Sequence, residues 1–224
     1  MAVFKKIVYW VDRVARDGPH AMAVDEWLGS VAQEPVLRVY PWAGDWCSLG
    51  YFGDINAAQC RIDCPNWVRR ITGGGVVDHR NDWTYSLVIP KSEPAAHWRG
   101  DASYHAIHQA LATVLRAEGV DCRLSSGPGF AGEPLCFSNP VDHDIVGQLG
   151  KKIAGAGQRR SRAGLLHQGS LSIPADRQRS ELRSHALAKA LAVDVISTAF
   201  APDPAAIERM VAERYGCEAW LHRR

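Results

Sequence analysis

Three consecutive glycines stand beside several side chains that can do chemistry. Gly73 to Gly75 lie between two apolar runs, with Arg69 and Arg70 before them and His79 after them. Glycine has no Cβ, so the backbone there can approach a ligand closely. Guanidinium groups donate paired hydrogen bonds to anionic oxygen atoms. The segment therefore indicates a cradle for an anionic or acyl-phosphate ligand. The alternative is a glycine-rich hairpin turn flanked by surface charges.

Two common nucleotide-binding motifs do not fit this segment. No Lys-Ser or Lys-Thr pair follows the three glycines, so the common phosphate loop is excluded. The dinucleotide fingerprint Gly-x-Gly-x-x-Gly is not met either.

A second segment, residues 136–171, combines a cysteine, a lysine and small residues. Cys136 lies in a stretch rich in glycine and proline, and Lys152 opens an expected strand. Side chains alternate along a strand, so Lys152 is expected to point inward and Lys151 outward. Gly155 and Ala156 leave room for another group near the backbone. A thiolate is a nucleophile, and a nearby ammonium group favours its formation.

Hydrophobic periodicity and turn residues predict which elements position these groups. The pattern predicts an α+β fold, with a mixed, mainly antiparallel sheet and helices on one side. Residues 1–224 are expected to form a single domain without a separate C-terminal domain. Strands are expected near 7–11, 36–40, 46–51, 67–71, 83–89, 143–148, 152–156 and 165–173, and helices over 20–32, 54–61, 101–118, 176–192 and 204–215.

The composition is that of an ordinary globular protein. The chain has 224 residues, of which 46% are hydrophobic and 22% charged, with a net charge of +2. This balance suggests neither nucleic-acid binding nor membrane attraction. No apolar run reaches the ~18 residues of a membrane span, and the N-terminus does not resemble a secretory signal.

The cysteines predict no metal site. Six are present, without a Cys-x2-Cys pair; Cys60 and Cys64 could share a helical face, but no second pair completes a zinc site. Without an export signal, reduced thiols and a cytoplasmic location are expected. His105 and His108 are expected at the surface or at helix caps.

Five segments, in order, resemble the catalytic domain shared by lipoate-protein ligases, octanoyltransferases and biotin-protein ligases. They are Ala21–Leu28, Leu37–Trp42, Ser48–Gly53, Arg69–Gly75 and Gly150–Ala156. The resemblance implies that Lys152 is the reactive-site lysine and that Cys136, in a Cys-Phe-x-x-Pro segment, is the nucleophile of a transferase. It implies that the substrate is bound by Arg70, Thr72, Gly73, Gly74, Gly75, His79, Gly155, Ala156 and His167.

The resemblance leaves the activity open among three readings. Cys136 favours an octanoyl or lipoyl transferase that needs no cofactor, with acyl carrier protein as donor and a lipoyl domain or H-protein-type acceptor. The third glycine of the motif, Gly75, is the residue that the ligases carry at this position. The ligases would use ATP and Mg²⁺ and pass through lipoyl-AMP. A noncatalytic acyl-binding relative is the third alternative.

Two departures from the family pattern keep the third reading open. His79 is followed by Arg80 where the family has Asp, and Asp82 is the candidate replacement. His167 precedes Gln168 where the family has Gln-His, which would turn the histidine to the opposite face of its strand.

The arrangement predicts one elongated apolar tunnel with a polar mouth, built by the glycine segment, Lys152 and the loop over 125–140. An acyl chain would be buried there, at about 0.8 kcal/mol per CH₂. Replacing Lys152 by alanine is expected to abolish transfer and leave folding intact.

Overall fold

A mixed sheet of eight strands organises the fold. The computed structural model describes residues 2–127 and 140–223. The strand order is β11-β1-β2-β6-β10-β9-β8-β7, and five of the seven pairings are antiparallel. This confirms the predicted α+β class with a mainly antiparallel sheet. The strands are β1 (Phe4–Val11), β2 (Val36–Tyr40), β6 (Trp83–Pro90), β7 (Arg123–Leu124), β8 (Ile145–Val146), β9 (Lys152–Ser161), β10 (Gly164–Leu171) and β11 (Ala192–Ser197).

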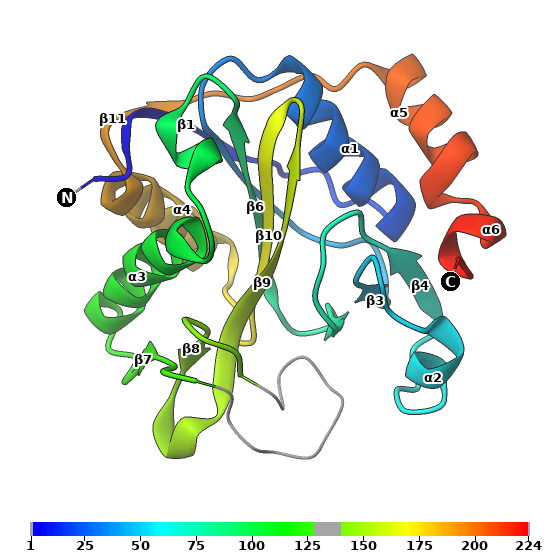
Figure 1. Ribbon diagram of the computed structural model, residues 1–224, viewed down its shortest axis with the longest axis horizontal. Helices are drawn as coiled ribbons and strands as arrows, with labels where there is room; N and C mark the ends of the chain where they lie inside the picture. The colour runs from blue at the N-terminus through cyan, green and yellow to red at the C-terminus, as the bar shows by residue number, and fades with distance from the viewer. Residues whose placement is uncertain (1, 128–139, 224) are drawn as a thin grey trace.

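Helices cover both faces of this sheet, so the expectation of helices on one side is wrong. Helices α3 (Ala102–Ala117) and α4 (Arg177–Leu191) lie on one face, and α1 (Gly18–Val31) and α5 (Pro204–Met210) on the other (Figure 1). The physical reason is visible in β2, in which every residue is buried. A strand whose side chains are buried on both sides needs cover on both sides.

A smaller sheet carries the glycine segment. Its order is β4 (Asn66–Arg69), β3 (Trp46–Leu49), β5 (Val76–Asp78). Residues 70–75, called the glycine loop below, connect β4 to β5. Helix α2 (Ile55–Gln59) ends before Cys60, so the predicted shared helical face of Cys60 and Cys64 does not form.

Local signals placed most helix ends correctly. Asp203 caps α5 by accepting a hydrogen bond from the Ala205 amide, with Pro204 in the first turn, as the sequence predicts. Gly119 follows α3 with φ +86°. The remaining short elements are η1 (Pro94–His97), η2 (Gln148–Gly150), the π-helical turn Val211–Tyr215 and α6 (Glu218–Leu221).

Within residues 2–127 and 140–223, no helix combines the length and apolar character needed to cross a bilayer.

Candidate active site

Lys152 and Asp144 form a buried ion pair beside the glycine loop. Nζ of Lys152 lies 2.7 Å from Oδ2 of Asp144, and their side chains are 4% and 0% exposed. Lys151 is exposed, so the predicted inward and outward orientations of the two lysines are confirmed. A cation this deep needs a partner, and Asp144 supplies the opposite charge.

The small residues after Lys152 are required by close packing. A Cβ at Gly155 would lie 2.5 Å from Nζ of Lys152 and 3.0 Å from Oδ1 of Asp144. A Cβ at Gly157 would overlap the carbonyl oxygen of Gly73. The missing side chain at Gly155 therefore leaves room for Lys152, and the missing side chain at Gly157 lets the glycine loop pack against β9.

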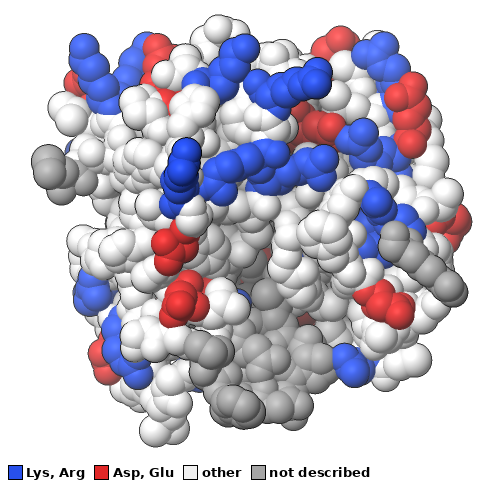
Figure 2. Space-filling view, viewed as in Figure 1, with Lys and Arg blue, Asp and Glu red and all other residues white. Residues whose placement is uncertain are grey.

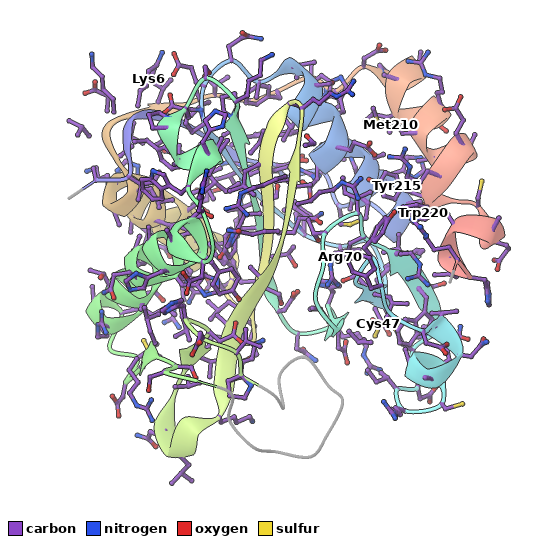
Figure 3. The ribbon with its side chains drawn as sticks, viewed as in Figure 1. Lys6, Cys47, Arg70, Met210, Tyr215 and Trp220 are labelled. Atoms are coloured by element: carbon purple, nitrogen blue, oxygen red, sulfur yellow. The ribbon has the colours of Figure 1, made fainter. Side chains whose placement is uncertain are left out.

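Arg70 holds the glycine loop in shape. Its guanidinium donates to the carbonyl oxygens of Gly73 and Gly75, both at 3.0 Å, and to the carbonyl and hydroxyl oxygens of Ser48 at 3.0 and 2.7 Å. Figure 3 shows Arg70 beside the small sheet. Gly74 has φ +97°, a conformation that favours glycine.

Arg69 points away from this site, which corrects the expectation that both arginines form the cradle. Its guanidinium is 1% exposed. Successive residues of β4 face opposite sides, so only one of two neighbouring arginines can reach the loop. Arg69 instead donates to six carbonyl oxygens, those of Gly50, Tyr51, Gly53, Trp220, Leu221 and Arg223.

His79 is fixed on both ring nitrogens. Nε2 lies 2.6 Å from Oγ of Ser48, and Nδ1 lies 2.7 Å from Oδ2 of Asp82. The ring stacks on Trp42 with centroids 4.0 Å apart. Asp82 is therefore the acidic partner of His79, as proposed from the sequence, and Arg80 pairs with Asp78 instead.

The glycine loop and the lysine line one narrow pocket of about 440 Å³, including its opening. Gly74 and Lys152 therefore meet at one site, as the sequence predicts. Met22, Tyr40, Trp42 and Val77 supply apolar walls. The polar lining consists of Ser48, Arg70, His79, Thr84, Lys152, Gln168 and Ser170, and the backbone of Gly155, Ala156, Gly157 and Gly169 completes it.

Gln168 takes the place in this pocket that the sequence assigned to His167. Its Oε1 accepts from the Thr72 hydroxyl at 2.7 Å, and its Nε2 donates to Oδ2 of Asp25 at 2.8 Å. His167 faces α3, where its ring lies near those of Tyr104 and His108. Its Nε2 lies 3.1 Å from the hydroxyl oxygen of Tyr85 on β6. The strand period of two residues explains this, because neighbours on β10 occupy opposite faces. The expectation that His167 binds substrate is therefore corrected.

Asp25 anchors this arrangement from α1. One carboxylate oxygen accepts from Arg38 at 2.7 Å and from the Ser86 hydroxyl at 2.6 Å, and the other accepts from Tyr40 at 3.0 Å. Burial opposes the charge of Arg38, but the Asp25 carboxylate raises the pKa of Arg38 above its usual range. A polar network thus lies behind the glycine loop, and both oxygens of the Asp25 carboxylate accept hydrogen bonds within it.

The predicted site residues therefore divide into groups. Arg70, Gly74, His79, Lys152, Gly155 and Ala156 line the pocket. Thr72, Gly73 and Gly75 shape the loop through the bonds given above. Cys136 lies outside the described residues. The sequence reasoning missed Asp144, Ser48 and Gln168; an acidic residue just before the Ile145–Val146 strand was the available signal for Asp144.

No group of three or more histidine, cysteine, aspartate or glutamate side chains suited to a metal ion occurs in residues 2–127 and 140–223.

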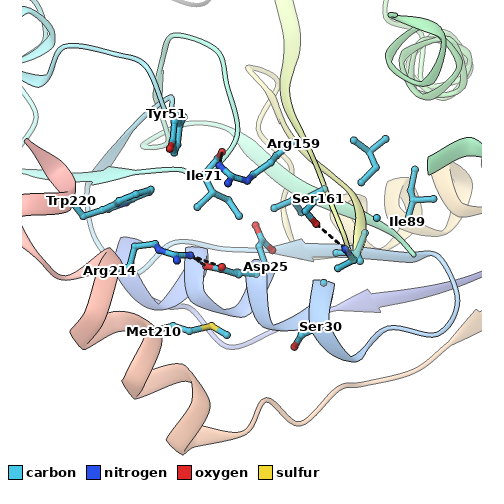
Figure 4. A pocket seen from close by; sticks show the side chains of 17 residues that line it. Asp25, Ser30, Tyr51, Ile71, Ile89, Arg159, Ser161, Met210, Arg214 and Trp220 are labelled. Atoms are coloured by element: carbon cyan, nitrogen blue, oxygen red, sulfur yellow. Dashed lines mark hydrogen bonds and ion pairs between the residues drawn. The ribbon is translucent and has the colours of Figure 1, made fainter. Parts of the chain in front are cut away.

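A larger groove of about 1060 Å³ lies on the other side of Ile71. Figure 4 shows Met210, Arg214 and Trp220 of the C-terminal helices opposite Arg159 of β9. It holds neither Lys152 nor His79, and the Thr72–Gln168–Asp25 chain of hydrogen bonds stands between it and the narrow pocket. Size alone therefore does not identify the reactive site.

Positive charge at the surface gathers away from Lys152. Arg159, Arg160 and Arg162 are exposed near the end of the β9–β10 hairpin, and Figure 2 shows a belt of lysine and arginine side chains on this face. Lys152, at the start of β9, is buried.

Comparisons with known proteins identify the family of this chain. The sequence pattern of the lipoyl protein ligase A/B catalytic domain matches residues 17–208. An octanoyltransferase LipM of Clostridioides difficile is 31% identical over 172 residues, which cover 71% of this chain and 63% of that protein. One of Kyrpidia tusciae is 32% identical over 194 residues, covering 72% of this chain and 69% of that protein. The chain thus spans less than two thirds of the length of the first of these relatives.

A solved structure shares the fold. The bipartite lipoate protein ligase of Thermoplasma acidophilum, studied with its E2 lipoyl domain, superposes with a TM-score of 0.69 at 16% identity. The superposition covers 97% of this chain and 96% of that one.

Proposed function

The chain belongs to the lipoyl protein ligase A/B catalytic domain family, and from this premise we propose that it is a protein-lysine acyltransferase of lipoate metabolism. It moves an octanoyl or lipoyl group from a carrier-protein thioester to a lysine of a lipoyl domain. The observation that carries this proposal is the Lys152 ammonium, held by Asp144 in the wall of the glycine-loop pocket. The LipM octanoyltransferases similar to this chain support the transferase reading.

Lys152 would act on the carbonyl oxygen of the acyl group. When a nucleophile attacks a thioester, negative charge develops on that oxygen, and a fixed ammonium group stabilises it. The Lys152 side chain is almost fully buried, and an ammonium group shielded from water interacts more strongly with this charge. His79, held between Ser48 and Asp82, is a second polar group aimed at the same pocket.

Cys136 would supply the nucleophile, as the family resemblance implies. Its thiolate attacks the acyl carbonyl, a new C–S bond forms, and the carrier thiolate leaves and takes up the proton that Cys136 released. The neutral amine of the acceptor lysine then attacks this acyl-enzyme. A C–N bond forms, the bond to Cys136 breaks, and the amine proton returns to the cysteine. No cofactor is consumed in these steps.

The family resemblance implies the partners of this reaction. The donor is an acyl carrier protein that holds the acyl group as a thioester. The acceptor is a lipoyl domain or an H-protein-type domain with an exposed lysine. The archaeal ligase that shares the fold was studied with an E2 lipoyl domain, which supports an acceptor of this kind.

One experiment distinguishes the transferase from its alternatives. The purified chain is mixed with octanoyl carrier protein alone, and its intact mass is recorded. A transferase gains one octanoyl group, hydroxylamine removes it, and Cys136→Ser lacks it. Cys217→Ser is the matched control, because Cys217 is a partly exposed thiol that does not line the pocket. An apo lipoyl domain added afterwards should receive the acyl group.

A ligase activity is the second candidate, favoured by the third glycine of the loop. In that case the carboxylate of lipoate displaces pyrophosphate from ATP, with Mg²⁺ as counter-ion, and the acceptor lysine then displaces AMP. Lipoate and ATP would modify the lipoyl domain, and Cys136→Ser would stay active. If neither donor mixture modifies the domain, both enzymatic readings fail and the noncatalytic alternative remains.

A further inference from the structure

Tyr104, on the face of the sheet away from the pocket, contacts the Asp144 carboxylate that holds Lys152. The hydroxyl of Tyr104, on α3, donates to Oδ1 of Asp144 at 2.5 Å. The same hydroxyl accepts from the Ala156 amide at 2.9 Å. Tyr104 therefore ties the helix both to the carboxylate and to β9, four residues beyond Lys152. It does not line the glycine-loop pocket.

Every oxygen of the Asp144 carboxylate has a defined donor. Oδ1 accepts from Tyr104, and Oδ2 binds Lys152 at 2.7 Å and accepts from the Val141 amide at 2.8 Å. A carboxylate held by two donors besides the ammonium has one orientation, and it fixes the end of a long flexible side chain. Without the hydroxyl, rotation of the carboxylate would let Nζ of Lys152 move.

Helix α3 presents a second anchor one turn later. Nδ1 of His108 lies 2.7 Å from the carbonyl oxygen of His143, the residue before Asp144. Tyr104 and His108 are four residues apart, so they share a face of the helix, and their rings lie 4.1 Å apart. Nε2 of His143 also lies 2.7 Å from Asp101. The segment that carries Asp144 is thus fixed to α3 at three successive points.

We propose that Tyr104 is a positioning residue for acyl transfer: through Asp144 it sets the location of the Lys152 ammonium group in the pocket. This inference rests on the proposed function and deepens it. It assigns a role in the reaction to a residue that touches neither substrate nor the reacting atoms. It also makes α3, which packs on the face away from the pocket, part of the catalytic arrangement.

The test compares two tyrosines whose hydroxyl groups have different partners. Tyr104→Phe keeps the ring and removes the hydroxyl. Tyr85→Phe is the matched control, because the hydroxyl of Tyr85 is buried on the same face and contacts His167 rather than Asp144. Steady-state transfer from octanoyl carrier protein to a lipoyl domain is measured for each variant. For Tyr104→Phe we expect kcat to fall by about 10- to 100-fold, as for other residues that orient a reactive group.

The KM for the carrier thioester should change by less than about threefold, because ground-state binding does not use Tyr104. Tyr85→Phe should keep kcat within about twofold of wild type. Both variants should remain folded at the assay temperature, with a loss of about 1–3 kcal/mol each for the missing buried hydrogen bond. A Tyr104→Phe enzyme with wild-type kcat overturns the inference, as does an equal fall of kcat in both variants.

A double-mutant cycle separates action through Asp144 from a general structural effect. If Tyr104 acts through the carboxylate, adding Tyr104→Phe to Asp144→Asn lowers kcat little further. Independent, multiplicative losses contradict the inference. Should Asp144→Asn fail to fold, Asp144→Ser provides the same comparison. If wild type uses only lipoate and ATP, the proposed transferase function fails, and the same cycle is read in that assay. If wild type transfers from neither donor, both proposals are overturned.

Discussion

Gly157 on β9 lies against the carbonyl oxygen of Gly73 so closely that no Cβ fits between them. A methyl group there would also lie 3.0 Å from the Thr72 hydroxyl. Two glycines from distant parts of the chain therefore set how closely the glycine loop approaches the strand that carries Lys152. This contact sets the distance between the glycine loop and β9, which form two walls of the pocket.

Gly157→Ala should displace the loop and weaken both stability and transfer. Overpacking of this kind costs about 1–3 kcal/mol, and we expect kcat/KM to fall at least about tenfold. Thermal unfolding and the transfer assay measure the two effects. Gly73→Ala is the matched control, because its Cβ would meet no atom within 4 Å. Its free energy of unfolding should stay within about 0.5 kcal/mol of wild type. Equal destabilisation by both substitutions would contradict the contact.

Lys152→Ala should abolish transfer and also destabilise the fold. The sequence alone suggested intact folding, but the structure shows that the substitution removes the partner of buried Asp144. Breaking a buried pair costs about 3–5 kcal/mol, and loss of the ammonium should lower kcat by about 100- to 1000-fold. Urea unfolding and single-turnover transfer provide the measurements.

Adding Asp144→Asn to Lys152→Ala separates the two roles of the lysine. The double variant should recover part of the lost stability, because no unpaired carboxylate is left, and it should remain inactive. Recovery of activity would show that Lys152 has no chemical role.

Arg69 and Arg70 should respond differently to substitution. Arg69→Ala leaves the six carbonyl oxygens without their donor, so we expect a loss of about 3 kcal/mol in unfolding free energy with nearly unchanged kcat/KM. Arg70→Ala removes the bonds that shape the glycine loop, so kcat/KM should fall by about tenfold or more. Chemical denaturation and steady-state kinetics compare the two variants. A larger fall in kcat/KM for Arg69→Ala than for Arg70→Ala would contradict the assignment of Arg69 to stability and of Arg70 to the site.

Two buried histidines should make the fold sensitive to acid. Burial lowers the pKa of His108 to about 4, and burial with the neighbouring His108 lowers the pKa of His167 well below its usual range. An unfolded chain protonates histidine near pH 6.5. Below about pH 6.5 the unfolded state therefore binds protons that the folded state excludes, and stability is lost as the pH falls toward 4.

Each histidine should contribute about 1.4 kcal/mol per pH unit in this range, and nothing further above it. Urea unfolding between about pH 5 and pH 7 measures the slope. His108→Gln should flatten it, whereas His105→Gln, at an exposed position of the same helix, should not. The structure thereby corrects the expectation that His108 lies at the surface: it is 0% exposed.

Local patterns in the sequence determined much of the architecture. Strongly periodic stretches such as α3, and capped starts such as Asp203 with Pro204, depend on near neighbours and are readable from the chain. Three strands were not predicted. Residues 76–78, 123–124 and 192–197 become β5, β7 and β11 only because partners elsewhere in the chain complete their hydrogen bonds.

The site divides in the same way. Residue types, their spacing and the family resemblance indicated Lys152, the glycine loop and the pairing of His79 with Asp82, because the order of the motifs can be read from the sequence. The order His167-Gln168 also indicated that the histidine would be turned to the opposite face of its strand, and the structure confirms this. Only the tertiary structure decided that Arg69 binds the C-terminal residues and that Asp144 and Tyr104 lie behind Lys152. These depend on strand register and on contacts between residues 40 or more positions apart, such as Tyr104 and Asp144, which local propensity does not encode.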